Sequence, residues 1–434
     1  MRRTICLLTL QLLLVGCFGH AQTRPETRSS GRVLLKAGRV LDVRGGHYIE
    51  TAGILIEGDR IKEVGPAAEV ATHTDKDVPI LDLGSATVLP GLIDCHTHLM
   101  ARIPSGPDGY IVNLATKSQA FRALEGAADA RATLQAGFTS VRDVENEGSE
   151  YADVALRDAI NQGLIEGPRM QVATKAIAAL GQYNPFGVSP DLTDFPTGAQ
   201  MISGVEQARS AVREQIAHGA DLIKVYADWS YPTLTVEEMS VIVAEAHKAG
   251  SKVAAHATTP EGIGNAITAG VDSIEHGHGA NRQNFEMMKA KAVYWVPTMG
   301  YYFYRIDEVK SPGAHKYMEE VLQRARENIP TARELGVRIA NGFDPSSPES
   351  HGQNAHEIIA MTRLGLRPIE AIRAATTTAA ELMEWQDKVG SIEAGKFADI
   401  IAVTGDPLVD ITEIERIKFV MKGGIVVRND IAQH

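Results

Sequence analysis

The sequence contains few cysteines for its length, three in 434 residues. Cys6 and Cys17 lie in the apolar N-terminal stretch, so Cys95 is the one cysteine beyond that stretch. A single thiol cannot form an internal disulfide, and the stability of the mature chain must therefore come from a large hydrophobic core. We expect Cys95 to be a small buried side chain that faces away from its histidine neighbours.

Basic residues are fewer than acidic ones, 43 against 54, and the formal net charge at pH 7 is −11. Without a basic face the chain cannot neutralise phosphates, which argues against nucleic acid as a partner. The charge says little about a small-molecule substrate. No low-complexity tract or internal repeat is visible. The length suits a large α/β barrel with a small satellite domain.

The N-terminus has the pattern of an export signal. Basic residues at positions 2 and 3 precede an apolar run, residues 5–15, that is too short for a stable membrane anchor. The pattern predicts a signal peptide over residues 1–21 and an exported protein, either periplasmic or anchored by lipid to a bacterial envelope. Two processing sites fit: cleavage before Gln22, or a lipoprotein box over residues 14–17 with the lipid on Cys17.

Both ends of the remaining chain show short alternating apolar runs separated by turn residues. They predict a small β-sandwich domain made from residues 31–90 together with 388–431. The runs lie at 33–35, 39–43, 53–56, 60–64, 80–83, 397–403, 417–421 and 425–427.

Between these ends, residues 91–387 alternate apolar strands with helical patterns, which predicts a (β/α)₈ barrel of the α/β class. The active site of such a barrel lies at the C-terminal ends of its strands. Helices are expected over 118–135, 205–218, 236–248, 260–269 and 317–335. Strands are expected to end near His98, Arg142, Lys175, Tyr226, His256, His276, Pro297 and Asp344.

Polar side chains interrupt these strands almost entirely at their C-terminal ends. Each of them alone could be an ordinary hydrogen-bonded residue, but together they predict a metal site. The six candidate ligands are His96, His98, Lys224, His256, His276 and Asp344.

Lys224 indicates the kind of site, because an ammonium group beside two cations would be repelled. A carbamate formed from Lys224 and CO₂ is anionic and can bridge two ions. We therefore expect two divalent cations, with Zn²⁺ as the expected metal, and a carboxylated Lys224.

The motif His96-Thr97-His98, with the other four ligands and the split β-sandwich, resembles the binuclear amidohydrolase superfamily. The stretches 221–226, 255–257 and 274–277 resemble its imidazolonepropionase-like branch, which contains Xaa-Pro dipeptidases and N-acyl amino acid amidases. The resemblance implies that His96 and His98 bind the first metal with Asp344, that His256 and His276 bind the second, and that Lys224 bridges them. Residues 179–187 depart from the Gly-Gly-His-Gly-Asp-like loop of dipeptidase relatives, so peptide specificity is not carried over.

The expected activity is hydrolysis of an amide bond in a dipeptide or an N-acyl amino acid, including aromatic ones, by a hydroxide shared between the ions. Asp344 is the expected catalytic proton carrier. Tyr226 shares a strand face with Lys224 and is expected to contact the oxyanion or the substrate carboxylate. His278 is a further candidate substrate contact, and Arg305, after the aromatic run 301–304, is a candidate carboxylate partner.

Three alternatives remain at this level. A cyclic amide hydrolase or lactonase would use the same binuclear centre, whereas a mononuclear deaminase of the superfamily usually has no bridging lysine. The third alternative is a metal-free scaffold protein that kept the barrel and lost the chemistry, and the intact ligand set argues against it. We also expect a homo-oligomer.

Overall fold

The computed structural model describes residues 31–104, 109–183, 189, 191–192, 195–229 and 231–431. The predicted signal peptide, with Cys17, and residues 184–187 of the divergent loop lie outside the described residues. In the part of the chain that is described, no helix has the length and hydropathy needed to cross a membrane.

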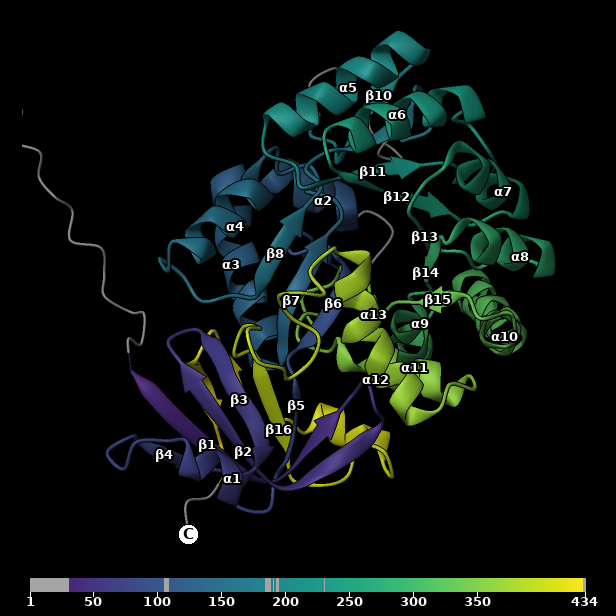
Figure 1. Cartoon of the computed structure of the whole chain (residues 1–434). Coiled ribbons are helices and arrows are strands. Elements are labelled where there is room, and N and C mark those ends of the chain that lie inside the picture. The colour runs from purple at the N-terminus through teal and green to yellow at the C-terminus, as the bar shows by residue number, and fades with distance from the viewer. Residues whose placement is uncertain are drawn as a thin grey trace, which may run out of the picture.

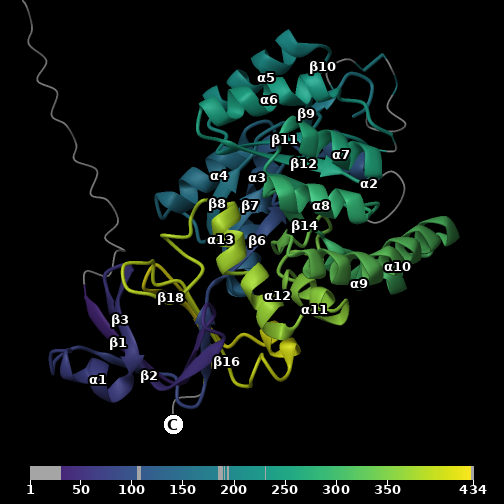
Figure 2. The same ribbon diagram turned by 45° about the vertical axis from the view of Figure 1, so that its right-hand side comes forward.

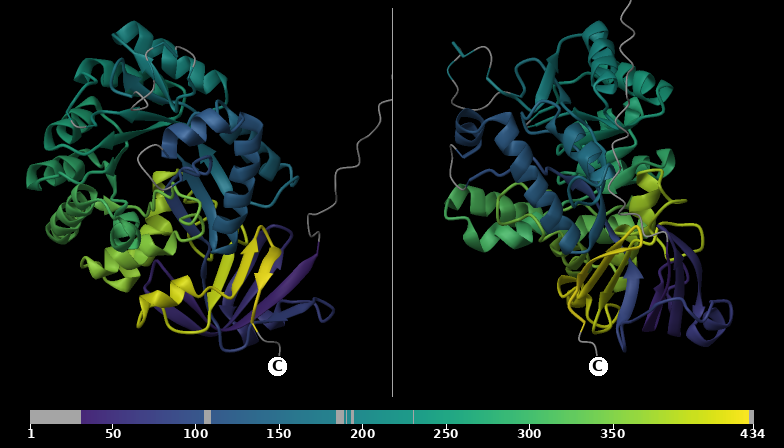
Figure 3. Two further views of the ribbon diagram at one scale, coloured as in Figure 1. Left: turned by 180° about the vertical axis from the view of Figure 1, so that it is seen from behind. Right: turned by 90° about the vertical axis from the view of Figure 1, so that its left-hand side faces the viewer.

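The two chain ends meet in one eight-stranded sheet, which Figures 1 and 3 show as purple and yellow strands side by side. Long β1 pairs with β2, β4 and β5, and β16 from the C-terminal end pairs antiparallel with β5. The order along the sheet is β18-β17-β16-β5-β1-β2-β3, with β4 beside β1. A two-layer sandwich built from this sheet stays a prediction. The strands are β1 (Arg32–Asp42), β2 (His47–Glu57), β3 (Arg60–Pro66), β4 (Ile80–Asp82), β5 (Thr87–Pro90), β16 (Ile400–Val403), β17 (Phe419–Lys422) and β18 (Ile425–Asn429).

The middle of the chain forms two parallel sheets, β6-β7-β8 and β10-β9-β11-β12-β13-β14-β15, with helices on their outer side (Figure 2). This confirms the expected α/β class. The strands are β6 (Leu92–Thr97), β7 (Phe138–Asp143), β8 (Arg169–Val172), β9 (Ala176–Ala179), β10 (Ala199–Ile202), β11 (Leu222–Tyr226), β12 (Lys252–Ala257), β13 (Ser273–His276), β14 (Tyr294–Val296) and β15 (Arg338–Ile339).

The five expected helices are present, although the one expected over 317–335 begins at Pro312, and helix ends have local causes. Helix α3 begins after Ser118, whose Oγ accepts a hydrogen bond from the Phe121 amide at 3.2 Å, and α10 ends at Gly336, whose φ is +71°. The helices are α1 (Ala67–Thr72), α2 (Gly109–Thr116), α3 (Gln119–Gln135), α4 (Ala152–Asn161), α5 (Val205–Ala217), α6 (Val236–Lys248), α7 (Pro260–Ala269), α8 (Arg282–Lys291), α9 (Met299–Arg305), α10 (Pro312–Leu335), α11 (Ala355–Arg363), α12 (Pro368–Ala374), α13 (Thr377–Leu382) and the short 3₁₀ turns η1 (Ile306–Glu308) and η2 (Ile411–Glu415).

The structure contains two parallel strands, β9 and β10, that the sequence pattern did not predict. Each is four residues long and they pair with each other, while β9 also pairs with β11 at Val225. A strand of four residues with a single β-branched side chain carries little strand signal, which explains why both were missed. The expected third barrel strand correspondingly ends at Val172 rather than at Lys175.

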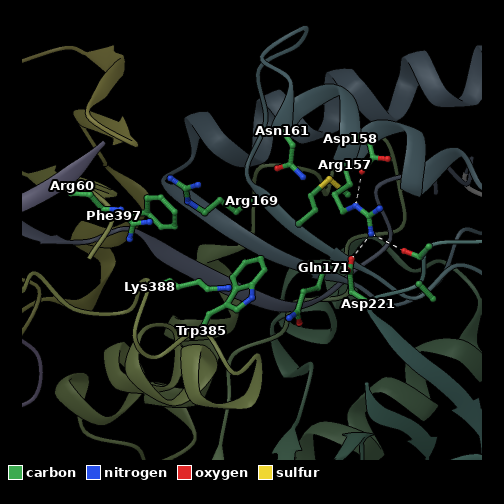
Figure 4. A pocket seen from close by; sticks show the side chains of 13 residues that line it. Arg60, Arg157, Asp158, Asn161, Arg169, Gln171, Asp221, Trp385, Lys388 and Phe397 are labelled. Atoms are coloured by element: carbon green, nitrogen blue, oxygen red, sulfur yellow. Dashed lines mark hydrogen bonds and ion pairs between the residues drawn. The ribbon is translucent and has the colours of Figure 1, made fainter. Parts of the chain in front are cut away.

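The terminal sheet shares a hydrophobic core with the parallel strands, and a stack of three side chains joins it to β8 (Figure 4). Phe397 lies between Arg60 of β3 and Arg169 of β8, with the guanidinium carbons 3.5 Å and 3.6 Å from the ring centre. Arg169 also donates to Asp399 at 2.8 Å. A cavity of about 620 Å³ opens beside this stack at the N-terminal end of β8, far from the histidines, and Lys388 belongs to its lining.

Candidate metal centre

A second cavity, of about 650 Å³, opens at the C-terminal ends of β6, β11, β12 and β13. Parallel strands present these ends at one edge of a sheet, which is why residues distant in sequence meet here. The cavity is lined by His96, His98, Glu147, Lys224, Tyr226, Trp229, His256, Thr258, Thr259, His276, His278, Tyr302, Tyr317, Val321, Arg324, Asp344 and Ser346. All six predicted ligands are among them.

His96, His98 and Asp344 form a tight group of donor atoms that lie within 4.8 Å of one another. Nε2 of His98 is 3.2 Å from Nε2 of His96 and 3.3 Å from Oδ1 of Asp344. Two imidazole nitrogens and a carboxylate oxygen converging in this way are a donor set that suits a divalent cation such as Zn²⁺. The residues present therefore fit the first metal position.

Asp344 reaches this position from the segment after β15. Its backbone amide donates to the carbonyl oxygen of His96 at 2.9 Å, and its φ of +64° is in the left-handed region. Such a conformation is uncommon for a residue other than glycine and is found preferentially at functional sites. Burial raises the pKa of the Asp344 carboxyl to about 6, against the opposing influence of His98.

Lys224, His256 and His276 come from three adjacent strands, β11, β12 and β13. The rings of His256 and His276 are 4.6 Å apart between centres. Nδ1 of His276 lies 2.8 Å from Oγ1 of Thr298, which itself donates to the carbonyl oxygen of Pro297. Thr298 must therefore accept from Nδ1–H, and this leaves Nε2 of His276 unprotonated as a possible ligand atom.

Lys224 is 1% exposed, and burial lowers the pKa of its amine. Its Nζ lies 5.8 Å from the centre of the Tyr226 ring. A buried lysine with a lowered pKa has a larger neutral fraction, and the neutral amine is the form that reacts with CO₂. This environment fits the carbamate expected from the sequence.

A buried chain of charges orients His96. Its Nδ1 donates to Oε2 of Glu275 at 2.7 Å, and Oε1 of Glu275 accepts from Nη2 of Arg142 at 2.7 Å. Arg142 also donates to the carbonyl oxygen of Cys95 at 2.6 Å and to Oγ of Ser273 at 3.1 Å. Because Nδ1 holds the proton, Nε2 of His96 faces the cavity unprotonated.

His98 has a carboxylate neighbour of its own, since its Nδ1 lies 2.9 Å from Oε1 of Glu147. Burial opposes a charge on His98, but the Glu147 carboxylate more than compensates and raises the pKa of the ring to about 10. Glu147, Glu275 and Asp344 together make the surroundings of these histidines negative, which favours bound cations.

The hydroxyl of Tyr226 is engaged with a buried carboxylate. It donates to Oε2 of Glu145 at 2.5 Å, while Tyr183 donates to Oε1 of the same residue at 2.5 Å. Burial, with the nearby Glu147, raises the pKa of Glu145 to about 7. With its only proton directed to Glu145, Tyr226 presents lone pairs to the cavity, an arrangement different from the oxyanion donor expected from the sequence.

Of the other two expected substrate contacts, one lines the cavity and one does not. His278 lines the cavity, with its Nδ1 3.3 Å from the hydroxyl of Tyr302. Arg305 does not line it, because its guanidinium faces Ser347 at 3.0 Å and Glu308 at 3.4 Å.

Several residues that line the cavity or contact its lining were not identified from the sequence. Glu145 and Glu147 follow β7 at alternate positions, which is the kind of signal that identified the histidines, and Glu275 is a charged residue inside a buried strand. Trp229, whose ring stacks on His256 at 4.8 Å and 11°, and Arg324 lie outside strands and carried no such signal.

Comparisons with known proteins agree with this geometry. Residues 87–427 match the Amidohydrolase family. The chain is 31% identical to ochratoxinase of Aspergillus niger over 426 residues, covering 87% of this chain and 83% of that protein, and 24% identical to imidazolonepropionase of Micrococcus luteus, covering 82% and 88%. It is also similar to the crystal structure of a Xaa-Pro dipeptidase with bound methionine in the active site, with a TM-score of 0.82, 31% identity and coverage of 92% of this chain and 100% of that one. The chain belongs to the amidohydrolase family, in its Xaa-Pro dipeptidase-like branch, and is a hydrolytic enzyme of this family.

Proposed function

We propose that the enzyme hydrolyses the amide bond of a dipeptide or an N-acyl amino acid, with aromatic amino acids among its products. The observation that carries this proposal is the convergence of His96, His98 and Asp344 with Lys224, His256 and His276 on one cavity. Relatives named ochratoxinase and Xaa-Pro dipeptidase support the choice of an amide substrate.

The proposed metal ligands are those that the resemblance of the sequence implies. His96, His98 and Asp344 would hold one divalent cation, His256 and His276 a second, and carboxylated Lys224 would bridge them, with Zn²⁺ as the proposed metal. Bound there, two such cations would lower the pKa of a shared water and polarise the scissile carbonyl.

Asp344 is the residue that moves protons in this proposal. Its Oδ1 lies 3.3 Å from Nε2 of His98, and its Oδ2 lies 3.9 Å from Nδ1 of His276. The carboxylate therefore lies between the histidines proposed for the first metal and those proposed for the second. From there it can accept a proton from the attacking water and donate it to the leaving nitrogen. Tyr226 and Trp229 line the wall of the cavity on the β11 side and exclude water.

The test is release of amino acids from Xaa-Pro, Xaa-Arg, Xaa-Phe and N-acyl amino acid substrates by zinc-loaded enzyme. Asp344→Asn should lower kcat by about 10²- to 10⁴-fold, the usual contribution of a proton-transfer group. Asp307→Asn, at an exposed position of η1, is the matched control and should leave kcat unchanged. Absence of release from the whole panel with two metals bound would contradict the proposal and favour a cyclic amide hydrolase or lactonase.

Two structural predictions belong to this proposal. We propose that the two parallel sheets close into one (β/α)₈ barrel. A hydrogen bond from the Cys95 amide to the Asn341 carbonyl supports closure at one seam, and one from the Asp221 amide to the Val172 carbonyl supports it at the other, at 2.8 Å each.

We also propose export to the bacterial envelope. Mass spectrometry of the mature N-terminus would identify Gln22 or a lipid-modified Cys17.

A further inference from the structure

One cation on the cavity wall has no carboxylate to neutralise it. Arg324 is an exposed residue of α10 that lines the cavity, and among the residues that the structure describes no carboxylate lies within ion-pair distance of its guanidinium. Arg305 differs in this respect, because it is held by Glu308 and Ser347 away from the cavity. An uncompensated guanidinium beside a catalytic cavity is suited to an anionic group of the substrate.

His278 adds a second polar group at the same place. It is 6% exposed and lines the cavity, yet its Nε2 has no hydrogen-bond partner within the described part of the chain. Buried polar atoms are nearly always hydrogen-bonded, so such an atom on a cavity wall indicates a missing partner.

The ring of His278 can act as a donor toward the cavity. When the Tyr302 hydroxyl donates to Nδ1, across their 3.3 Å separation, the proton of His278 resides on Nε2. The ring centre of His278 is 5.4 Å from that of His276, a candidate metal ligand. A group bound by His278 therefore lies beside the position of the scissile amide.

We propose that Arg324 and His278 bind the free carboxylate of the amino acid half of the substrate. This inference rests on the proposed function and deepens it, because it makes a carboxylate next to the scissile nitrogen a requirement for tight binding. An α-carboxylate is one carbon away from that nitrogen, which matches the short separation between His278 and His276. Arg324 takes the role that the sequence pattern suggested for Arg305.

The test compares two substrates that differ only in this charge, N-acetyl-L-phenylalanine and N-acetyl-L-phenylalaninamide, with acetate release as the readout for both. Arg324→Gln should raise KM for the carboxylate substrate by about 10- to 100-fold, the loss typical of a charge-assisted hydrogen bond, and change kcat much less. KM for the neutral amide should stay within about twofold, and Arg324→Lys should recover part of the loss. Arg326→Gln, two residues along on another face of α10, is the matched control.

Equilibrium binding separates this inference from the proposed function. Calorimetric titration of both compounds into metal-loaded Asp344→Asn protein, with and without Arg324→Gln, should show the same selective loss for the carboxylate. If the wild-type enzyme hydrolyses neither compound, the activity proposed for this substrate class fails, while the titration still decides whether Arg324 binds a carboxylate. Equal loss for both compounds, or no loss for either, would overturn the inference.

Discussion

The orientation of His96 depends on a single buried carboxylate. Glu275 joins His96 to Arg142, and all three side chains are almost completely buried. Burial of these charges is tolerated because each is paired, and removing one would leave the others uncompensated. Glu275 is thus a positioning residue for the metal ligand rather than a ligand itself.

We expect Glu275→Gln to weaken metal binding by about 10- to 100-fold, the range reported for hydrogen-bond partners of metal-ligating histidines. Glutamine keeps the shape but no longer fixes the proton on Nδ1 of His96. Competition with a chromophoric chelator would measure the affinity, and Glu286→Gln at an exposed position of α8 is the control. Wild-type affinity in Glu275→Gln would refute this role.

The buried carboxyl of Glu357 makes the free energy of unfolding depend on pH. Burial raises the pKa of Glu357 from 4.5 to about 8, and one of its oxygens accepts a hydrogen bond from the Gly300 amide. Below pH 4.5 both the folded and the unfolded carboxyl are protonated. As pH rises toward 8, only the unfolded state releases its proton, so the free energy of unfolding falls across this interval.

Glu357→Gln removes this dependence while keeping an oxygen for the Gly300 amide. Relative to wild type, the variant should gain about 2 kcal/mol or more in free energy of unfolding between about pH 5 and about pH 9. Denaturant titrations at several pH values would measure the difference. A difference that is constant with pH would contradict the prediction.

Among the elements, Phe397 connects strand β3 of the terminal sheet with strand β8. Its ring is covered on both faces by Arg60 and Arg169. The stack combines apolar burial with two cation–π contacts, so it contributes to stability at a position distant from the candidate metal centre.

Phe397→Ala should lower the free energy of unfolding by about 2–4 kcal/mol, because it removes a large side chain together with both cation–π contacts. Thermal or urea denaturation of the metal-loaded protein would measure the change. Val409→Ala, at a residue that is 83% exposed, should stay within about 0.5 kcal/mol of wild type. An equally small effect of Phe397→Ala would show that the stack does not stabilise the fold.

For the molecule as a whole, the candidate metal centre joins segments from β6, β11, β12, β13 and the end of β15, and metal binding should therefore stabilise the entire fold. Cations that bind only the folded state add about 4 kcal/mol at a thousandfold excess over Kd. Chelation should lower Tm and zinc should restore it, as measured by calorimetry. Lys224→Ala should reduce the zinc-dependent gain, whereas a Tm unaffected by chelation and zinc would contradict a structural contribution from the metal.

For the whole molecule, the sequence predicted several helices but not all of the strands or the cavity-lining arginine. The helices α3, α5, α6 and α7 were predicted to within one residue at each end, because their apolar periodicity and capping residues are local signals. Strands β9 and β10 were missed because strands of only four residues depend on their neighbours for their formation. Arg305 was chosen because it follows an aromatic run, and Arg324 carried no such local signal. Only the packing of α9 and α10 decides that Arg324 lines the cavity and that Arg305 does not.

The sequence by itself determined the α/β class, the β-strand character of both chain ends, and the six candidate ligands. These depend on side-chain alternation and on polar residues at strand ends, which are patterns local to each strand. The tertiary structure decided which carboxylates orient the histidines, that Tyr226 donates to Glu145, and that Arg324 and His278 share a wall of the cavity. These relations join residues far apart in the chain, and their geometry exists only once the strands and helices have packed together.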